Sequence, residues 1–272
     1  PLNQCLTADE ITQITGILNG TTNYILTKMS RDGSSYEEVL KEAQQLGYAE
    51  RNPEADVEGY DACRKIAILT SLAFGSTVNY EDVCTEGITK ISTEDFAYAE
   101  KIGCVVKLLA TSKKINDKVY AITAPFLIEK EHPLYNVNDV LNGIYIKGNV
   151  IGDVMFFGAG AGKLPTASAV VADVVDCVKH KGKNVMTVWS SEKIELGNVE
   201  DVERYFFVRV KGSVDKDLSE VEKAFGDIDV VTVDGIDGEF GFVTSLMTEK
   251  AFNAAAANVE VINRIRIDKT RI

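Results

Sequence analysis

Cysteine and histidine are scarce in this sequence. Its five cysteines lie far apart and include no C-x-x-C pair, and the two histidines are His132 and His180. So few thiols and imidazoles predict neither a disulfide framework nor a zinc or other histidine-based site, and we assign no metal-binding residues. The absence of a disulfide framework favours the reducing cytoplasm as the location of the protein.

Positively charged residues are also fewer than negatively charged ones. The 272 residues contain 29 Lys and Arg against 41 Asp and Glu, for a formal net charge of −12 at pH 7. Such a field repels nucleic-acid phosphates and anionic membrane surfaces, so we expect neither nucleic acid nor a membrane as a partner. The chain begins at Pro1 in place of Met, without a signal-peptide pattern, and we expect an excised or processed piece of a protein.

Length and composition predict a folded chain. Apolar residues make up 45% and charged residues 26% of the sequence, which are ordinary values for globular domains. A chain of this length is accommodated more readily in about two domains than around a single core.

The first part of the chain alternates strand and helix signals. Residues 10–19 predict a short strand that turns through glycine and threonine into a helix ending near Arg31. Ser35 and Glu38 have the spacing of a capping box, and the helix that they open is expected to end at Gly47.

A long helix is predicted from Asp56 to about Gly75, with Asp56 capping its first turn. Its apolar residues fall on two stripes, and the second stripe starts with Asp61 and Lys65 and continues to Ile68. We therefore expect this helix to be central and the Asp61–Lys65 pair to be half-buried.

The remainder of the chain mixes helices with β-rich segments. A helix near 93–101 is followed by three β-rich segments, a helix of small residues and a polar linker, at 104–112, 118–129, 143–157, 165–180 and 189–204. The last block has the order strand, helix, strand, strand, helix, strand, at 205–212, 217–225, 228–234, 239–247, 249–258 and 260–268. This βαββαβ order is that of a ferredoxin-like plait. The fold class is therefore α/β (α+β), with a mixed-sheet domain covered by helices and then a βαββαβ domain.

A glycine-rich run before the small-residue helix invites two nucleotide-binding interpretations, and its spacing fits neither. Phe157 and Leu164 stand where a P-loop needs Gly and Ser or Thr, and Lys163 stands where a dinucleotide fingerprint needs glycine. What remains is a turn from Gly158 to Gly162 before a helix start, whose backbone amides can approach an anion or the edge of a cofactor. Tight packing of the turn is the alternative explanation.

One lysine stands among acidic residues. Asp61 and Lys65 are four apart and share one face of a helix, with the acid on the N-terminal side, the orientation that favours an ion pair. A partly buried lysine held in this way can exchange a proton with a substrate hydroxyl. Glu50 and Asp56, in the acidic segment before the pair, are suited to bind an ammonium group. A solvated helix face is the alternative interpretation of the cluster.

The turn from Asn19 to Asn23 opens a helix. Its amides and hydroxyls can hold a carboxylate, although an ordinary helix cap has the same residues. Together with the acidic segment and the lysine–aspartate pair, this turn predicts a site for a small amino acid that bears a hydroxyl or an aldehyde group.

These motifs resemble those of the homoserine dehydrogenase family. The resemblance covers residues 1 to about 185 and is carried by separated motifs in the same order: Gly16 to Leu26, Leu46 to Glu50, Asp56 to Gly59 with Asp61 to Lys65, and Gly158 to Ala172. The block over 203–272 is similar to the ACT-type regulatory domain of many bacterial members. We accordingly expect domains at 1–185 and 203–272, joined by a linker over 186–202.

The resemblance implies an activity and a set of site residues. Members of the family interconvert L-homoserine and L-aspartate 4-semialdehyde with NAD or NADP, in threonine, methionine and isoleucine biosynthesis. By the matching motifs, Lys65 would exchange the hydroxyl proton, and Asp61 would orient Lys65 and contact the same hydroxyl. The substrate-binding residues would be Asp61 together with Thr21, Tyr48, Glu50 and Asp56. The residues beside the cofactor would be Gly158, Gly160 and Gly162.

The comparison with the family also bears on domains and partners. The family begins with a Rossmann domain that carries a glycine fingerprint; this sequence contains none, so we expect the nucleotide-binding domain to be missing and the chain alone to be inactive. The ACT-type block is expected to pair with a second copy, giving a homodimer, and to take an amino-acid effector such as threonine. In this block, residues 212–218 replace the Pro-Gly pair that usually follows the first strand. The alternative hypothesis is an amino-acid-sensing regulatory module without catalysis of its own.

Overall fold

Strands and helices are mixed along the whole chain. The structure, a computed structural model, describes residues 2–185 and 189–269. The strands are β1 Ile11–Ile17, β2 Ser76–Thr77, β3 Cys84–Thr85, β4 Cys104–Ile115, β5 Lys118–Glu129, β6 Leu141–Gly148, β7 Gly152–Ala159, β8 Ser190–Lys193, β9 Glu203–Lys211, β10 Ile228–Val231, β11 Glu239–Thr244, β12 Met247–Thr248 and β13 Val261–Asp268. The α-helices are α1 Leu2–Cys5, α2 Gly20–Asp32, α3 Tyr36–Gln45, α4 Glu54–Val57, α5 Tyr60–Phe74, α6 Thr93–Lys101, α7 Lys163–Lys179, α8 Val214–Phe225 and α9 Glu249–Ala256. The 3-10 helices are η1 Tyr80–Asp82 and η2 Val199–Asp201.

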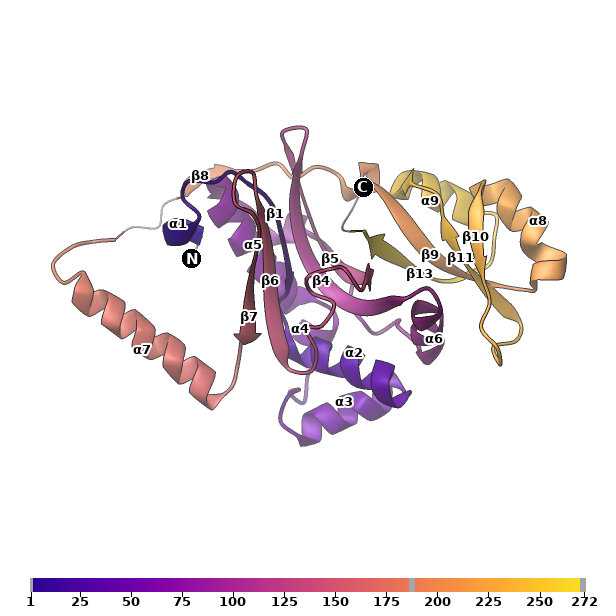
Figure 1. The fold of residues 1–272 in the computed structure, drawn as a ribbon, viewed down its shortest axis with the longest axis horizontal. Helices are drawn as coiled ribbons and strands as arrows, with labels where there is room; N and C mark the ends of the chain where they lie inside the picture. The colour runs from indigo at the N-terminus through magenta and orange to yellow at the C-terminus, as the bar shows by residue number, and fades with distance from the viewer. Residues whose placement is uncertain (1, 186–188, 270–272) are drawn as a thin grey trace.

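One large mixed sheet connects the two halves of the molecule. Within the described residues it has eleven strands, in the order β10-β11-β9-β13-β5-β4-β1-β6-β7, with β12 paired to β9 and β3 paired to β5 beside this path. Figure 1 shows α2 and α3 packed beside the first half of the sheet, and α8 and α9 at the far end. The expected mixed α/β fold class is confirmed.

The helix starts expected near the beginning of the chain are confirmed. Asn19 has an extended backbone and caps α2, since its side-chain oxygen accepts a hydrogen bond from the backbone N of Thr22. Ser35 and Glu38 form the predicted capping box of α3. Gly47, with a φ of +76°, follows the end of that helix. Caps of this kind depend on residues within a single turn, which is why the sequence predicts them well.

The prediction of a single long helix from Asp56 is wrong. The chain forms α4 and then α5, with a break at Gly59, whose φ of +81° lies in the left-handed region. Gly87 packs so closely against this break that a Cβ atom there would overlap the carbonyl oxygen of Val57. Asp56 therefore lies within α4 and does not cap the long helix, whereas α5 ends before Gly75 as predicted.

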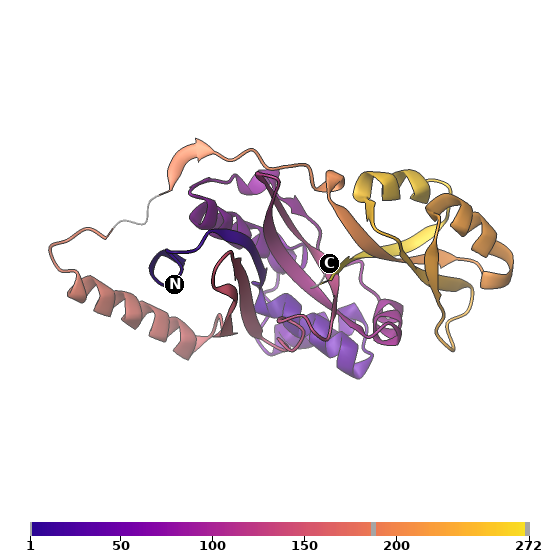
Figure 2. The ribbon, with the colours of Figure 1, turned by 45° about the horizontal axis from the view of Figure 1, so that its top comes forward.

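The central β-rich region forms two antiparallel hairpins. β4 and β5 are paired from Cys104↔Glu129 to Ile115↔Lys118, and the third expected segment resolves into two strands, β6 and β7. The predicted small-residue helix is present as α7. In both ribbon views it stands away from the sheet (Figures 1 and 2), and its valine side chains are exposed.

The last block has the expected βαββαβ order. Its strands lie in the order β10-β11-β9-β13. Its helices cover one face of these strands through a core of aromatic side chains, Phe206, Phe225, Phe240, Phe242 and Phe252. On the other face, the ring of Phe207 lies 5.4 Å from the ring of Tyr98 in α6. This block is thus packed against the first one.

Two long-range strand pairings are not visible in the sequence pattern. β13 pairs in parallel with β5, with Arg266 opposite Phe126, so the strands of the plait continue the first sheet. The expected polar linker over 189–204 contains β8, which pairs with β2; residues 186–188 of the linker expected over 186–202 lie outside the described residues. Both connections depend on long-range pairing, which local periodicity does not encode.

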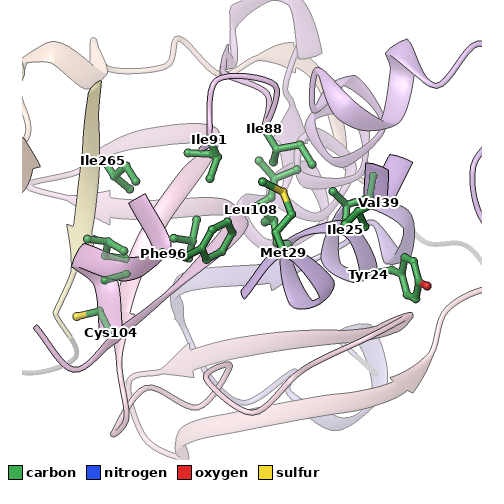
Figure 3. Packing of buried hydrophobic residues seen from close by; sticks show 14 of the residues in the cluster. Tyr24, Ile25, Met29, Val39, Ile88, Ile91, Phe96, Cys104, Leu108 and Ile265 are labelled. Carbon is green, nitrogen blue, oxygen red and sulfur yellow. The ribbon is translucent and has the colours of Figure 1, made fainter. Parts of the chain in front are cut away.

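A hydrophobic cluster fixes the helices around the candidate site (Figure 3). It contains Ile25 and Met29 of α2, Val57 of α4 and Ile265 of β13. Because one close-packed core anchors α2 and α4 together, the residues at the start of α2 keep a defined position relative to those of α4.

Candidate functional site

Asn19 lies at the junction between β1 and α2 and is only 6% exposed. Its Oδ1 accepts a hydrogen bond from the backbone N of Thr22 at 2.9 Å. Its Nδ2 donates to Oδ1 of Asp56 at 2.7 Å and to Oδ2 of Asp61 at 2.9 Å. A single side-chain amide therefore joins the start of α2 to an acid from α4 and an acid from α5.

Lys65 completes this cluster from the second turn of α5. Its Nζ donates to Oδ2 of Asp61 at 2.7 Å and to the carbonyl oxygen of Leu18 at 2.9 Å. The side chain of Asp61 is 32% exposed and thus half-buried as expected, whereas the side chain of Lys65, at 49%, is more exposed than expected. Ile68, which was expected to extend the same line toward the core, is 53% exposed. The solvated-face interpretation is thus correct for the helix surface but misses the contacts of the pair with the β1–α2 junction.

The hydrogen-bonding groups and charges of the cluster determine which ligands it can bind. Oδ2 of Asp61 accepts hydrogen bonds from both Asn19 and Lys65, whereas Asp56 contributes a second carboxylate. An ammonium group has three N–H donors, and two of those of Lys65 have acceptors among the described residues. The remaining N–H can donate to an oxygen of a ligand, and the second carboxylate favours a ligand that carries positive charge.

Thr21 brings the expected amine-binding segment to the same place. Its Oγ1 donates to the carbonyl oxygen of Tyr48 at 2.7 Å. Gln44 donates to the carbonyl oxygen of Glu50 at 3.1 Å, and the side chain of Glu50 is exposed. The structure therefore places Thr21 and Tyr48 in direct contact and holds Glu50 in the adjacent loop. Among the described residues, the Glu50 side chain makes no hydrogen bond or ion pair with the lysine cluster.

The glycine turn is connected to the end of β1 through Asn142. A Cβ atom on Gly160 would overlap the side-chain oxygen of Asn142, whose Nδ2 donates to the carbonyl oxygen of Ile17 at 2.9 Å. Tight packing therefore accounts for Gly160. By contrast, a Cβ atom on Gly158 would meet nothing within 4 Å, so the turn is open at that point. The turn therefore lies close to the end of β1, to which Asn142 connects it.

The buried side chain of Lys107 contacts both α2 and the 137–141 segment. Nζ of Lys107 donates to the carbonyl oxygen of Val137 at 2.6 Å and to Oδ1 of Asn138 at 2.9 Å. Asn23 accepts from the same Nζ and donates to three carbonyl groups of the 137–141 segment. Burial, and to a lesser degree the charge of Arg31, lowers the pKa of Lys107 to about 8. This network fixes the 137–141 segment against α2.

The roles of Asn19 and Lys107 could not be assigned from the sequence. Asn19 has the signature of a helix cap, which is correct, but nothing local indicates that its amide reaches two acids 37 and 42 residues away. Lys107 lies in a segment that predicts a strand, and the one signal that marks it is a lysine within an otherwise apolar run.

Two further observations concern metal ions and membranes. Across residues 2–185 and 189–269, no group of three or more His, Cys, Asp or Glu side chains is arranged to hold a metal ion. In the same ranges, no helix is both long enough and apolar enough to cross a membrane.

Comparisons with known proteins agree with this arrangement of motifs. Residues 1–175 match the family model described as homoserine dehydrogenase. A homoserine dehydrogenase of Synechocystis sp. is 52% identical over 182 residues, covering 65% of this chain and 42% of the relative. A crystal structure of a homoserine dehydrogenase from Thiobacillus denitrificans covers 98% of this chain and 66% of its own, at 33% identity and a TM-score of 0.89.

A third relative is a structure of a hyperthermophilic archaeal homoserine dehydrogenase mutant in complex with NADPH, which matches 65% of this chain and 50% of its own at 30% identity and a TM-score of 0.54. The chain spans about two fifths of the length of the curated Synechocystis relative. The family model covers well over half of the chain, in the region that carries the lysine cluster and the glycine turn. This chain belongs to the homoserine dehydrogenase family.

Proposed function

We propose that the protein to which this chain belongs interconverts L-homoserine and L-aspartate 4-semialdehyde with a nicotinamide nucleotide. The observation that carries the proposal is the cluster of Lys65, Asp61, Asp56 and Asn19, found in a chain of this family. A charged lysine with one N–H directed to a ligand oxygen, beside an excess carboxylate, suits a small amino acid with a reacting oxygen on its side chain.

In the reducing direction, Lys65 would act as the proton donor. The aldehyde oxygen would accept the third N–H of its ammonium group. As the aldehyde carbon gains a hydride, the C=O double bond would open, and the proton of that N–H would move to the oxygen to form the alcohol. Asp61 would keep Nζ oriented throughout and would stabilise the ammonium form before transfer. Oxidation of homoserine would use the same groups in reverse.

The amine of the substrate would be held by the acidic side of the cluster. Asp56 and Glu50 would supply carboxylates, and the backbone of Tyr48 would supply an acceptor, since Thr21 already holds that carbonyl at the start of α2. The free N-terminal amides of α2 would then face the substrate carboxylate. Thr21, Tyr48, Glu50, Asp56 and Asp61 are the residues that we assign to substrate binding.

A nicotinamide nucleotide, NAD or NADP, would supply the hydride. The described residues fit only an edge of such a cofactor, because the turn is open at Gly158 while Gly160 is occupied by packing with Asn142. We propose that Gly158, Gly160 and Gly162 border the nucleotide and that most of its contacts come from residues beyond this chain. The NADPH complex of the archaeal relative supports this class of cofactor.

The plait over 203–272 is proposed to be an ACT-type regulatory domain, with residues 1–185 as the catalytic domain and 186–202 as the linker. The observed βαββαβ order supports this assignment. An amino-acid effector such as threonine and a homodimer are part of the same proposal. In the β9–α8 loop, Oδ2 of Asp217 accepts from the backbone N of Ser213 at 2.7 Å and fills the space beside Gly212.

The proposed reaction is tested by nicotinamide absorbance at neutral pH. The full-length product of this gene and the 272-residue chain are assayed in parallel with L-homoserine and either NAD or NADP. We expect turnover by the full-length product and none by the chain alone. Absence of turnover in both, with either nucleotide, would contradict the proposed activity and favour a regulatory module; a rise in thermal stability with threonine would then support that alternative.

A further inference from the structure

We propose that Asn19 is a positioning residue, whose side-chain amide holds the carboxylates of Asp56 and Asp61 together and thereby sets where Lys65 presents its proton. The kinetic consequence of this role depends on the function proposed above. Its electrostatic consequence does not, because it follows from the contacts of Asn19 alone.

The geometry gives the Asn19 amide two separate tasks. Oδ1 caps α2 through the backbone N of Thr22, and Nδ2 donates to both acids, at 2.7 and 2.9 Å. In the described part of the chain, Nδ2 is the side-chain donor that the two carboxylates share. Two carboxylates this close repel each other when both are charged. The Asn19 amide offsets this repulsion and adds no charge of its own.

The position of Lys65 depends on this bridge. Oδ2 of Asp61 accepts from Asn19 and from Lys65 at once, and the second contact of Nζ is the carbonyl oxygen of Leu18, the residue that precedes Asn19. Movement of the Asp61 carboxylate away from Asn19 would therefore carry Nζ with it, away from a substrate held at the start of α2.

The variant Asn19→Asp separates capping from bridging. Asn and Asp cap helices about equally well, so the variant keeps the acceptor for the start of α2. It replaces the shared Nδ2 donor by an oxygen that faces two carboxylates. The matched control is Asn198→Asp, since Asn198 caps η2 through the backbone N of Glu200 at 3.0 Å and lies outside the lysine cluster.

In kinetic measurements on the full-length product, we expect Asn19→Asp to lower kcat by roughly 10²-fold at pH 8, because small displacements of a reacting group have effects of this size. The loss should shrink as the pH falls toward 6, since one proton shared among three carboxyl groups restores a donor at the bridge. Asn198→Asp should keep the kcat and pH profile of the unmodified enzyme. A variant at Asn19 with an unmodified kcat and pH profile would overturn the proposal.

Chemical unfolding of the same proteins tests the inference without any turnover. Repulsion among three neighbouring carboxylates should make the folded state of Asn19→Asp bind a proton more tightly than the unfolded chain does. The stability of the variant relative to the unmodified protein should therefore fall as the pH rises from 5 to 8. Asn198→Asp should show no such slope. Absence of the slope in Asn19→Asp would refute the bridging role. An unmodified enzyme without turnover would refute the proposed function and leave this measurement to decide on Asn19.

Discussion

Lys65 makes contacts that an ordinary surface ion pair does not make. On a solvated helix, a lysine and an aspartate four residues apart contribute only about 0.2–0.5 kcal/mol. Here the same Nζ also donates to the carbonyl of Leu18, at the end of β1, so the pair is tied to the junction where the substrate is proposed to bind. This second contact holds Nζ at the place where the proton transfer is proposed to occur.

Replacement of Lys65 by methionine in the full-length enzyme should lower kcat by roughly 10²–10⁴-fold, the range of a general acid or base. The matched control is Lys28→Met on α2, because Lys28 and Asp32 form an ion pair of the same spacing at 2.7 Å. That control should keep its kcat. Steady-state rates with L-homoserine provide the measurement, and a Lys65→Met enzyme within threefold of the unmodified kcat would contradict the catalytic assignment.

Lys107 is a second single residue with a measurable effect, because it makes the free energy of unfolding depend on pH. Its pKa is lowered to about 8 in the folded protein, chiefly by burial, from 10.5 in an unfolded chain. Between these values the unfolded chain binds the proton more tightly, so the free energy of unfolding should rise with pH, by up to about 3 kcal/mol. Lys107→Met should lack this rise. Urea unfolding of both proteins at pH 7.5 and pH 10 measures it, and identical pH slopes would exclude Lys107 as its source.

At the scale of elements, the break between α4 and α5 decides where the two acids lie. Asp56 and Asp61 would be five residues apart on one continuous helix, a spacing that places them on different faces. The left-handed backbone at Gly59 turns α4 so that both carboxylates reach the same amide of Asn19. The cap at Asn19 and the turn at Gly59 therefore matter as much for this site as the two acids.

Alanine at Gly59 should be costly for activity. A positive φ costs a non-glycine residue about 1–2 kcal/mol, and a Cβ atom at this position would also lie 3.3 Å from methyl groups of Thr85 and Thr123. The control is Gly75→Ala at the other end of α5, where φ is +75° and a Cβ atom would meet nothing within 4 Å. Both variants should lose similar backbone stability. Only Gly59→Ala should lose kcat/KM, by roughly 10- to 100-fold, and equal losses in both variants would contradict this assignment.

At the scale of the whole molecule, Glu86 ties the plait to the first block. It accepts hydrogen bonds from Arg264 and Arg266 of β13, and Arg266 also contacts Glu249 of α9. Burial by itself would raise the pKa of Glu86, but the hydrogen bond and charge of Arg266, with the charge of Arg264, lower it to about 2. The pairing thus stabilises the fold at neutral pH, and the stability is lost as the pH falls from about 4.5 through about 2.

Glu86→Gln should weaken the junction between the blocks. Loss of the charged acceptor should lower the free energy of unfolding by about 1.5–3 kcal/mol, the range for hydrogen bonds to charged groups. Amide hydrogen exchange should rise at the β13–β5 pairing. Glu260→Gln is the control, because Glu260 pairs with Lys211 on the exposed surface of the same plait. Unchanged exchange at β13 in Glu86→Gln would show that strand pairing alone holds the blocks together.

The sequence by itself determined the local features of this protein. The cap at Asn19, the box of Ser35 and Glu38 and the pairing of Asp61 with Lys65 were predicted, as was the βαββαβ order of the last block. Each depends on residues within a few positions of one another, or on the succession of strand and helix patterns, so it can be read along the chain.

Only the tertiary structure decided what the site is made of. The break at Gly59, the bridge from Asn19 to Asp56 and the parallel pairing of β13 with β5 join residues that are remote in sequence or depend on a remote packing partner. Such contacts are set by strand register and by close approach of backbones in the core, neither of which has a local signature. From the sequence alone, a glycine is interpreted as a turn residue and an asparagine as a helix cap. Any further role becomes visible only when the residues packed against it are known.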